Sequence, residues 1–519
     1  MSDDKTFVSL LYADEAACAD AAFTPLAGDS VIADLHIDQI LAEVTKGYEE
    51  FDLEQLFRRK PARRRDAEFR LAVAWDMWDD GMRDEIIRYL AGFSTARRYL
   101  RTGESIYETP LKEKWKLDAA AAYVETIDAI CARAGEKAAS EGLDRFFAWV
   151  RAYAATEAYG HLRESALSVA AAINAVSYSL DVDLGQNTVC VGADAGAGDA
   201  CEDLMKTFAR YDLRHVSRDI TAFADVNMNM LEHRILDVIL AEHKNLQTDL
   251  VGFSRRFDGF IHENIMAFER DAHFYISYIM FAKGLEKKGF VFSIPRFLED
   301  GGLSIDGGYD MSLAALRSGA DQIVENSFDI YAGERSFVLT GPNQGGKTTF
   351  SRMLGQNLFF AWNGLPVPCR GATILWANAL NTHFNVEENP GDDTGRLKEE
   401  LRRLKRILSS APANSFIILN ELFSSATAYD ALEMARRVIR LFGRKQCVCL
   451  YITHLFELAA ESGVVSLVAE TDGGAESVCT YKIARGASKM NALAAKLLTG
   501  RRLRAGEIKE RINAAVPVV

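Results

Sequence analysis

The feature that most constrains the fold of this chain is an apolar segment that leads directly into a glycine-rich loop. Residues 336–340 read Ser-Phe-Val-Leu-Thr, and residues 341–348 follow as Gly-Pro-Asn-Gln-Gly-Gly-Lys-Thr. The apolar segment predicts a buried strand, and Thr349-Phe-Ser-Arg-Met-Leu-Gly after the loop predicts the start of a helix. A G-x-x-x-x-G-K-[ST] pattern between a strand and a helix is typical of loops that bind phosphate groups.

Each residue type in this loop has a physical reason to be there. Glycines let backbone N–H groups converge on phosphate oxygens, and the helix N-terminus adds partial positive charge. Lys347 is expected to reach the β- and γ-phosphates, and the Thr348 hydroxyl to bind Mg²⁺. The sequence therefore predicts that ATP or a close relative binds with magnesium. The expected contacts come from Gly341, Pro342, Asn343, Gln344, Gly345, Gly346, Lys347, Thr348 and Thr349.

Two further apolar segments end in polar residues that suit the same chemistry. Phe416-Ile-Ile-Leu is followed by Asn420 and Glu421, and the segment 448–452 is followed by Thr453 and His454. The carboxyl ends of parallel strands are where open α/β sheets bind ligands. Glu421 is the candidate base that activates an attacking water, and His454 is placed to sense the γ-phosphate.

Asn420 is expected in the metal shell, where most such ATPases have an aspartate. An amide accepts a hydrogen bond from a metal-bound water, but it brings no negative charge.

The 519 residues are too many for one hydrophobic core, so two to four domains are expected. From about 31 to 300 the pattern is mostly helical, as in Leu231, Ile235 and Ile239, with one predicted strand at 176–184 and a small-residue loop at 192–198. After Pro295, strand–loop–helix alternation continues to about 500, which predicts a mostly parallel α/β sheet.

Composition and charge narrow the class of protein. No apolar run reaches the roughly 18–20 residues of a membrane helix, and the acidic start leads into no secretory segment, so a cytoplasmic protein is expected. The net charge of −13 disfavours a dedicated nucleic-acid coat. The densest basic cluster, Arg58-Arg59-Lys60 and Arg63-Arg64-Arg65, is interpreted as a solvated loop or helix start. A local basic groove remains the alternative. Cys447 and Cys449 are expected as buried strand thiols.

The three motifs together resemble the MutS family of DNA mismatch-repair ATPases. The resemblance is carried by Thr340-Gly-Pro-Asn-Gln-Gly-Gly-Lys-Thr-Thr, by Asn420-Glu-Leu-Phe-Ser-Ser-Ala-Thr-Ala-Tyr-Asp and by Thr453-His-Leu-Phe-Glu-Leu. It continues in Tyr481-Lys-Ile-Ala-Arg-Gly-Ala-Ser-Lys and, more weakly, in Asp34-Leu-His-Ile-Asp-Gln-Ile and the stretch from His273 to Pro295.

The resemblance implies a fold, domain limits and further site residues. The fold is an ABC/MutS-type P-loop NTPase domain of the α/β class at 301–505, preceded by a mostly α-helical core and lever domain at 31–300 with a reduced clamp. Residues 1–30 form an N-terminal extension, and 506–519 form a short tail. Ile323 and Val324 fall where the family packs the adenine, although plain packing explains them equally well. Tyr481 is placed to lay its ring against that base, and Thr382 to contact the γ-phosphate of the opposite subunit.

The chain also departs from the family pattern. The mismatch-reading N-terminal domain with its Phe-x-Glu wedge is not visible. The clamp is at most the short strand and loop around 176–200. About a dozen extra residues near 389–396 precede a charged helix, whose Leu397, Leu401, Leu404 and Leu408 are expected to dock on the sheet.

These observations predict a MutS-like, ATP-dependent DNA-binding protein that hydrolyses ATP as a homodimer in mismatch repair or a related repair process. Mismatched or branched DNA is the expected partner, and no membrane is expected. One alternative is an ATP-gated scaffold with little hydrolysis, which Asn420 favours. A second alternative is another ATPase of the ABC type, although the chain lacks the L-S-G-G-Q segment of that class.

Overall fold

The computed structural model describes residues 8–21, 28–106, 109–133, 138–183, 188–193, 230–298, 302–384, 396–472 and 478–486. The chain forms two compact units that interleave along the sequence. The first contains Met1–Val8, Gly81–Ala138 and Leu143–Glu269, and the second contains Ser9–Asp80, Ala139–Gly142 and Arg270–Val519. The second unit therefore draws on residues from both sides of position 300, and the predicted domain limits stay a prediction.

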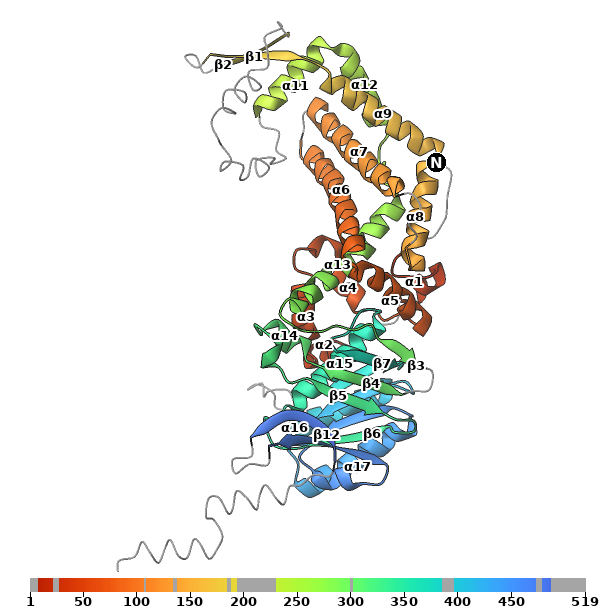
Figure 1. Cartoon of the computed structure of the whole chain (residues 1–519), viewed down its shortest axis with the longest axis vertical. Coiled ribbons are helices and arrows are strands. Elements are labelled where there is room, and N and C mark those ends of the chain that lie inside the picture. The colour runs from red at the N-terminus through yellow and green to blue at the C-terminus, as the bar shows by residue number, and fades with distance from the viewer. Residues whose placement is uncertain are drawn as a thin grey trace, which may run out of the picture. The chain divides into compact units, whose positions relative to one another are not determined.

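The first unit consists of long helices and one hairpin among its described residues (Figure 1). The antiparallel hairpin pairs β1 (Tyr178–Asp183) with β2 (Thr188–Ala193), and β1 lies within the strand predicted at 176–184. Phe146 and Phe268 stack in the core with ring centroids 3.7 Å apart. Ile235 and Ile239 are buried, as their helical spacing predicts. Its helices are α6 (Asp80–Glu104), α7 (Thr109–Ala132), α8 (Glu141–Ala154), α9 (Glu157–Asn174), α11 (Met230–Glu242), α12 (Lys244–Arg256) and the start of α13 (Glu263–Glu286), as far as Glu269.

The second unit contains both larger sheets. The six-stranded sheet has the order β12-β11-β6-β10-β9-β8, in which all neighbours are parallel except β11 and β12. The strands predicted at 336–340 and 448–452 are β6 and β10, and the predicted strand at 416–419 extends by one residue in β9. The bounds are β6 (Ser336–Thr340), β8 (Leu380–His383), β9 (Phe416–Asn420), β10 (Val448–Ile452), β11 (Val464–Thr471) and β12 (Cys479–Arg485).

The four-stranded sheet of this unit has the order β3-β7-β4-β5 and is mixed, with only β3 and β7 parallel. Helix α15 (Lys347–Trp362) is buried along nearly its whole length and contacts strands of both sheets. It therefore forms the middle of this unit's core. The strands are β3 (Arg296–Leu298), β4 (Leu303–Gly308), β5 (Asn326–Ile330) and β7 (Gly371–Leu375).

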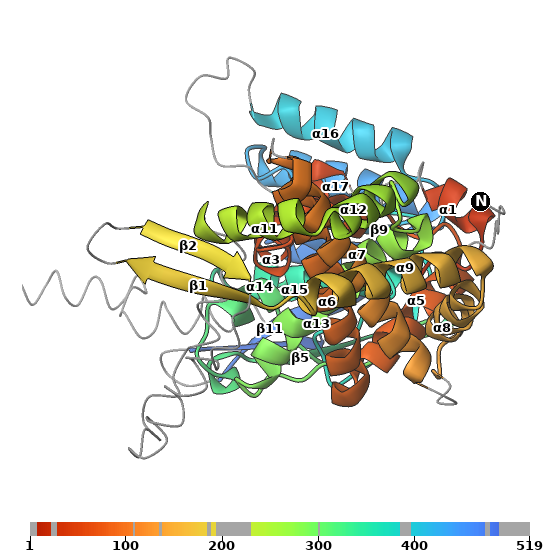
Figure 2. The ribbon, with the colours of Figure 1, turned by 90° about the horizontal axis from the view of Figure 1, so that it is seen from above.

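Two amphipathic helices, α16 (Arg396–Ser410) and α17 (Ala428–Arg444), pack with β9 and β10 in one apolar cluster. Leu404 lies in that cluster, and Leu397 and Leu408 pack against it, whereas Leu401 is 42% exposed. The docking predicted for α16 is thus confirmed for three of its four leucines. Helix α16 is one uninterrupted helix in Figure 2. The extra segment at 389–395 lies outside the described residues.

Shorter helices complete the second unit. These are α1 (Glu15–Ala21), α2 (Asp29–Asp34), α3 (Ile37–Val44), α4 (Leu53–Phe57), α5 (Arg64–Trp78), α14 (Met311–Ala315) and the 3-10 turns η1 (Glu49–Phe51), η3 (Ala320–Gln322) and η4 (Phe456–Ala460). Among the described residues, no helix combines the length and the apolar character needed to cross a bilayer.

The basic cluster at 58–65 is not simply solvated. Lys60 is 3% exposed, with Nζ 4.0 Å from the centre of the Trp376 ring and hydrogen-bonded to the Ala377 carbonyl. Arg58 pairs with Asp29 and Glu54. Arg63 pairs with Asp14 and Asp66, and Arg64 with Glu68. The prediction of a solvated stretch was therefore wrong for Lys60, because its ammonium group lies over the rings of Trp362 and Trp376.

The cysteines behave as expected where they are described. Cys447 and Cys449 are buried, free thiols on or beside β10, and burial raises the pKa of Cys449. Most of the predicted loop at 192–198 and the predicted tail at 506–519 lie outside the described residues.

Acid is expected to destabilise the second unit through His383, the last residue of β8. Burial, with the Arg403 guanidinium nearby, lowers the pKa of His383 to about 4 from its ordinary 6.5. Between pH 6.5 and about pH 4, the His383 ring is protonated in the unfolded chain and neutral in the folded chain. Stability present above pH 6.5 is therefore lost as the pH falls toward 4. Between about pH 7 and about pH 5 the loss amounts to about 2 kcal/mol.

Urea unfolding of the wild type and His383→Leu at both pH values measures this loss. The variant lacks the titrating ring, so acidification should cost it about 2 kcal/mol less than it costs the wild type. An equal loss in the two proteins would contradict the assignment to His383.

Candidate functional site

Three strand ends meet at one edge of the six-stranded sheet. β10 lies between β6 and β9 and runs parallel to both, so their carboxyl ends are adjacent. The Glu421 N–H donates to the Ile452 carbonyl at 2.9 Å, and the Thr453 N–H donates to the Leu339 carbonyl at 3.0 Å. These bonds extend the ladder beyond the strands. The loop after β6 and the polar residues after β9 and β10 are consequently held side by side.

The loop 341–348 requires glycine at two positions because of its backbone. Gly341 has φ +143°, and a Cβ there would lie 2.7 Å from the Ala469 Cβ. Gly346 has φ +84° and directly precedes α15, which begins at Lys347. The first N–H groups of a helix have no partner within the helix. The end of the loop therefore offers backbone donors and a positive dipole end to an anion.

Lys347 folds back over its own loop. Its side chain is 5% exposed, and Nζ donates to the carbonyls of Pro342 at 2.8 Å and Gly341 at 3.1 Å. Burial lowers the pKa of Lys347, which the nearby Glu421 carboxylate opposes. The ammonium group thus has two neutral acceptors, and phosphate oxygens would be stronger ones because they carry charge.

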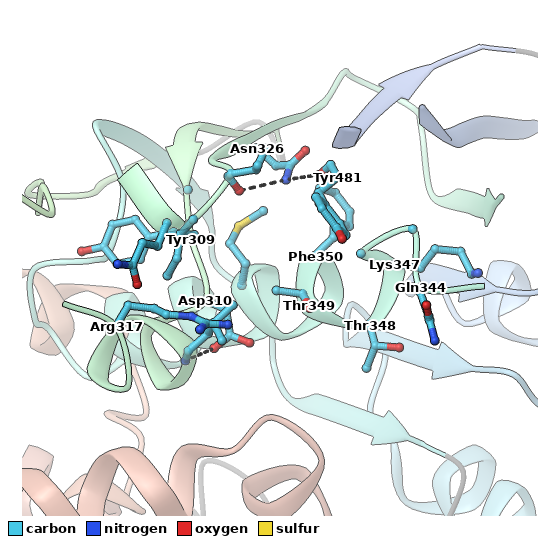
Figure 3. A pocket seen from close by; sticks show the side chains of 18 of the residues that line it. Tyr309, Asp310, Arg317, Asn326, Gln344, Lys347, Thr348, Thr349, Phe350 and Tyr481 are labelled. Carbon is cyan, nitrogen blue, oxygen red and sulfur yellow. Dashed lines mark hydrogen bonds between the residues drawn. The ribbon is translucent and has the colours of Figure 1, made fainter. Parts of the chain in front are cut away.

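A pocket of about 530 Å³ lies along the N-terminal half of α15 (Figure 3). In Figure 3, Gln344, Lys347 and Thr348 lie at one end, whereas Tyr309, Asp310 and Arg317 lie at the other. Such a volume suits a single small ligand. The predicted residues that line it are Ile323, Val324, Asn343, Gln344, Gly345, Gly346, Lys347, Thr348, Thr349, Glu421 and Tyr481.

Tyr481 and Val324 are held at this pocket by Asn326, the first residue of β5. The Asn326 amide donates to the Tyr481 carbonyl at 3.0 Å and to the Val324 carbonyl at 3.4 Å, and it accepts from the Ile483 N–H at 2.8 Å. Tyr481 itself has φ +58° and is 50% exposed, so its ring is open to a ligand. Asn326 joins β5 to β12 and thereby fixes one wall of the pocket.

Several pocket residues were not predicted from the sequence. They include Gly308, Tyr309, Asp310, Leu313, Arg317, Asp321, Gln322, Phe350 and Met353. Only Asp310 carried a local signal, since it caps α14 by accepting from the N–H groups of Ser312 and Leu313. The others come from the end of β4, from α14 and the turns around it, from η3 and from α15, and no motif marks them.

Asn420 lies behind Thr348 rather than in the pocket lining. Its Nδ2 donates to Thr348 Oγ1 at 3.3 Å, and its residue is 7% exposed. Asn420 Oδ1 is buried without a hydrogen-bond partner in the described part of the chain. A buried orphan acceptor beside a hydroxyl fits a metal-bound water. The donor set is neutral, and no group of three or more His, Cys, Asp or Glu side chains suited to a metal occurs among the described residues. The residues therefore fit Mg²⁺ only together with charged phosphates.

Glu421 and His454 are in contact at the pocket edge. His454 Nε2 lies 3.2 Å from Glu421 Oε1, and the two side chains are 45% and 37% exposed. Glu421 has φ +54°, which turns it away from the strand direction. The structure thus joins the candidate base to the candidate sensor.

Thr382 is not brought to this pocket. It is 1% exposed within β8, and its hydroxyl donates to Asp34 Oδ2 at 2.6 Å. The surface contact with a phosphate that the family pattern implied does not match this buried position, because strand neighbours and Asp34 enclose the hydroxyl. Gly341 and Pro342 contribute carbonyls to Lys347 and do not line the pocket either.

A glycine-rich loop, a helix N-terminus, a buried lysine and a carboxylate around one pocket define a candidate nucleotide-binding site. Residues 337–492 match the family model described as MutS domain V. The matched region carries most of the residues of this site, and it is this part of the chain that is similar to the MutS family.

Two curated relatives match the same part of the chain. The DNA mismatch repair protein MutS of Erythrobacter litoralis (strain HTCC2594) is 32% identical over 167 residues, which are 32% of this chain and 19% of that protein. The DNA mismatch repair protein MutS of Granulibacter bethesdensis (strain ATCC BAA-1260 / CGDNIH1) is 28% identical over 176 residues, 34% of this chain and 19% of that protein. The matched part thus spans about a fifth of each relative's length.

Loss of the Asn326 amide should weaken nucleotide binding, although Asn326 is not among the residues expected to contact the phosphates. Asn326→Ala removes the hydrogen bonds to Tyr481 and Val324, so the wall formed by β12 loses its register with β5. We expect the affinity for ATP to fall about tenfold, equivalent to about 1.4 kcal/mol. Fluorescence titration with a labelled ATP analogue measures this. Asp329→Asn on the same strand is the matched control, and an equal loss there would contradict the role of Asn326.

Proposed function

We propose that this protein is an ATPase with a P-loop NTPase domain of the ABC/MutS type, and that nucleotide binding is coupled to DNA binding. The observation that carries the proposal is the convergence of Lys347, Thr348 and Glu421 on one pocket at the shared edge of β6, β9 and β10. The match of residues 337–492 to MutS domain V supports the proposal, since members of the MutS family are ATPases.

Each residue has a distinct task in the proposed reaction. The N–H groups at the start of α15 and the Lys347 ammonium bind and orient the β- and γ-phosphates. Glu421 accepts a proton from the attacking water. His454, which contacts Glu421 in this structure, orients that carboxylate and faces the γ-phosphate. Ile323, Val324 and Tyr481 hold the base at the other side of the pocket.

Thr348 and Asn420 are the residues that would hold Mg²⁺. When bound, the metal neutralises charge on the β- and γ-phosphate oxygens. The Asn420 amide occupies a lone pair of Thr348 Oγ1 and supplies no negative charge. This chain therefore holds the metal more weakly than a chain with a carboxylate at position 420 would.

The larger assembly is part of the same proposal. Residues 31–300 act as the helical core and lever and 301–505 as the ATPase domain of a cytoplasmic homodimer. ATP binds one dimer conformation more tightly than the other and so raises the population of that conformation. This population shift changes the affinity of the helical lever domains for mismatched or branched DNA. Thr382 has no phosphate-contacting role in this proposal, since its hydroxyl is buried and donates to Asp34.

Steady-state phosphate release tests the hydrolytic step. The wild type should turn over ATP, and Glu421→Ala should reduce the rate by about 10²-fold or more, because the water loses its proton acceptor. Binding of ATP should stay within about threefold, since the phosphate contacts of Lys347 and α15 remain.

The second candidate function, an ATP-gated scaffold with little hydrolysis, makes the opposite prediction. Equal phosphate release by wild type and Glu421→Ala would favour the scaffold. Asn420→Asp then identifies the cause, because a carboxylate at 420 restores charge to the metal site. A gain in rate with this variant would show that Asn420 limits the chemistry.

DNA binding is expected to be weak, independent of sequence and sensitive to salt. The whole chain carries net charge −13, and much of its densest basic cluster is already paired with carboxylates. Fluorescence anisotropy with homoduplex, mismatched and branched DNA, with and without ATP, measures affinity and shape preference. Each phosphate contact should contribute about −0.9 to the slope of log affinity against log salt. Affinity that stays constant between low and moderate salt would contradict an electrostatic interface.

A further inference from the structure

The loop that carries the candidate base has an unusual backbone. Glu421 has φ +54° and Phe423 has φ +65°, so two of the three residues directly after β9 are left-handed without being glycine. Side chains other than glycine adopt this conformation at a cost in free energy, and it persists where the surroundings hold it in place. The direction in which Glu421 points therefore depends on contacts made by neighbouring elements.

One of these contacts comes from a buried carboxylate on α16. Glu400 is 6% exposed, and its Oε2 accepts the Phe423 N–H at 2.9 Å. Loss of a hydrogen bond in a buried site is costly, because the N–H group would be left without a partner. The Tyr451 hydroxyl donates to the Leu422 carbonyl at 3.4 Å. The backbone immediately after Glu421 is thus held by two side chains from two different elements.

The position of Glu400 is fixed because helix α16 is itself held by contacts with other elements. One turn beyond Glu400, Arg403 donates to the carbonyls of Phe384 at 3.3 Å and Thr382 at 3.4 Å, and it forms an ion pair with Asp34. Asp34 also accepts from Thr382 and from the Phe384 N–H. Leu404 on the adjacent turn lies in the apolar cluster that contains Leu422 and Phe423.

We propose that Glu400 is a positioning residue for Glu421. Its carboxylate holds the Phe423 N–H and thereby keeps the loop after β9 in the left-handed conformation that directs Glu421 into the pocket. Glu400 does not line the pocket and touches no reacting atom. The inference rests on the proposed hydrolysis, because it assigns a residue that orients the base of that reaction.

The closing experiment uses the full chain and three variants. Glu400→Ala removes the acceptor, Glu400→Gln keeps an oxygen acceptor in nearly the same shape, and Glu399→Gln removes the neighbouring exposed carboxylate of α16 as the matched control. For each protein we would measure kcat and KM for ATP, the affinity for a labelled ATP analogue, the midpoint of thermal unfolding, and hydrogen exchange of the peptide that contains Phe423.

Positioning predicts a specific pattern. Glu400→Ala should lower kcat at least about tenfold while KM and nucleotide affinity change by less than about threefold, and its Phe423 peptide should exchange at least about tenfold faster. Glu400→Gln should recover most of kcat and of the exchange protection, and Glu399→Gln should match the wild type. Unchanged kcat in Glu400→Ala, or a loss of kcat and nucleotide affinity in parallel with lower thermal stability, would overturn the proposal.

Failure of this inference is separable from failure of the proposed function. If the wild type releases phosphate no faster than Glu421→Ala, the hydrolytic function fails, and the exchange measurement still decides whether Glu400 holds the loop. If hydrolysis is present and exchange at Phe423 is the same in Glu400→Ala and wild type, Glu400 has no positioning role.

Discussion

The candidate site depends on the parallel hydrogen-bond ladder that places β10 between β6 and β9. Parallel strands end at the same edge, so the glycine-rich loop, Glu421 and His454 become neighbours although more than a hundred residues separate the first from the last. The bonds from Glu421 N–H to Ile452 and from Thr453 N–H to Leu339 continue the ladder into the loops. Without this register, the same side chains would share no pocket.

Position 420 shows how one atom changes the chemistry available at that edge. An aspartate there would accept a hydrogen bond from the Thr348 hydroxyl and add negative charge, whereas the asparagine donates a hydrogen bond to Thr348 Oγ1. The polarity of the contact is reversed, and the remaining amide oxygen is buried beside the hydroxyl. The site therefore carries less negative charge at this position than it would with an aspartate. In the proposed function, this substitution would affect hydrolysis through the metal while leaving the phosphate contacts of Lys347 and α15 unchanged.

The corner between α2 and α3 connects the site to the N-terminal helices within the second unit. The Asp34 carbonyl accepts from Arg352 and the Leu35 carbonyl accepts from Gln356, both on α15. A Cβ at Gly355 would lie 2.6 Å from Leu35, so the corner sits close against that helix. The Asp34 carboxylate also accepts from Thr382 on β8 and pairs with Arg403 on α16. The same carboxylate therefore both encloses the Thr382 hydroxyl and holds α16 in place.

The sequence by itself determined the strands β6, β9 and β10, the loop 341–348 and the residues that follow each strand, because apolar runs and glycine spacing are local signals. It also placed Ile323, Val324 and Tyr481 at one pocket through family resemblance. Only the tertiary structure decided that Lys60 is buried beside tryptophan rings, that Thr382 faces Asp34, that Asn326 ties β5 to β12 at the pocket wall, and that Glu400 holds the loop after β9 from outside the pocket. Those contacts join residues far apart in the chain, and no local pattern encodes a partner that arrives through folding.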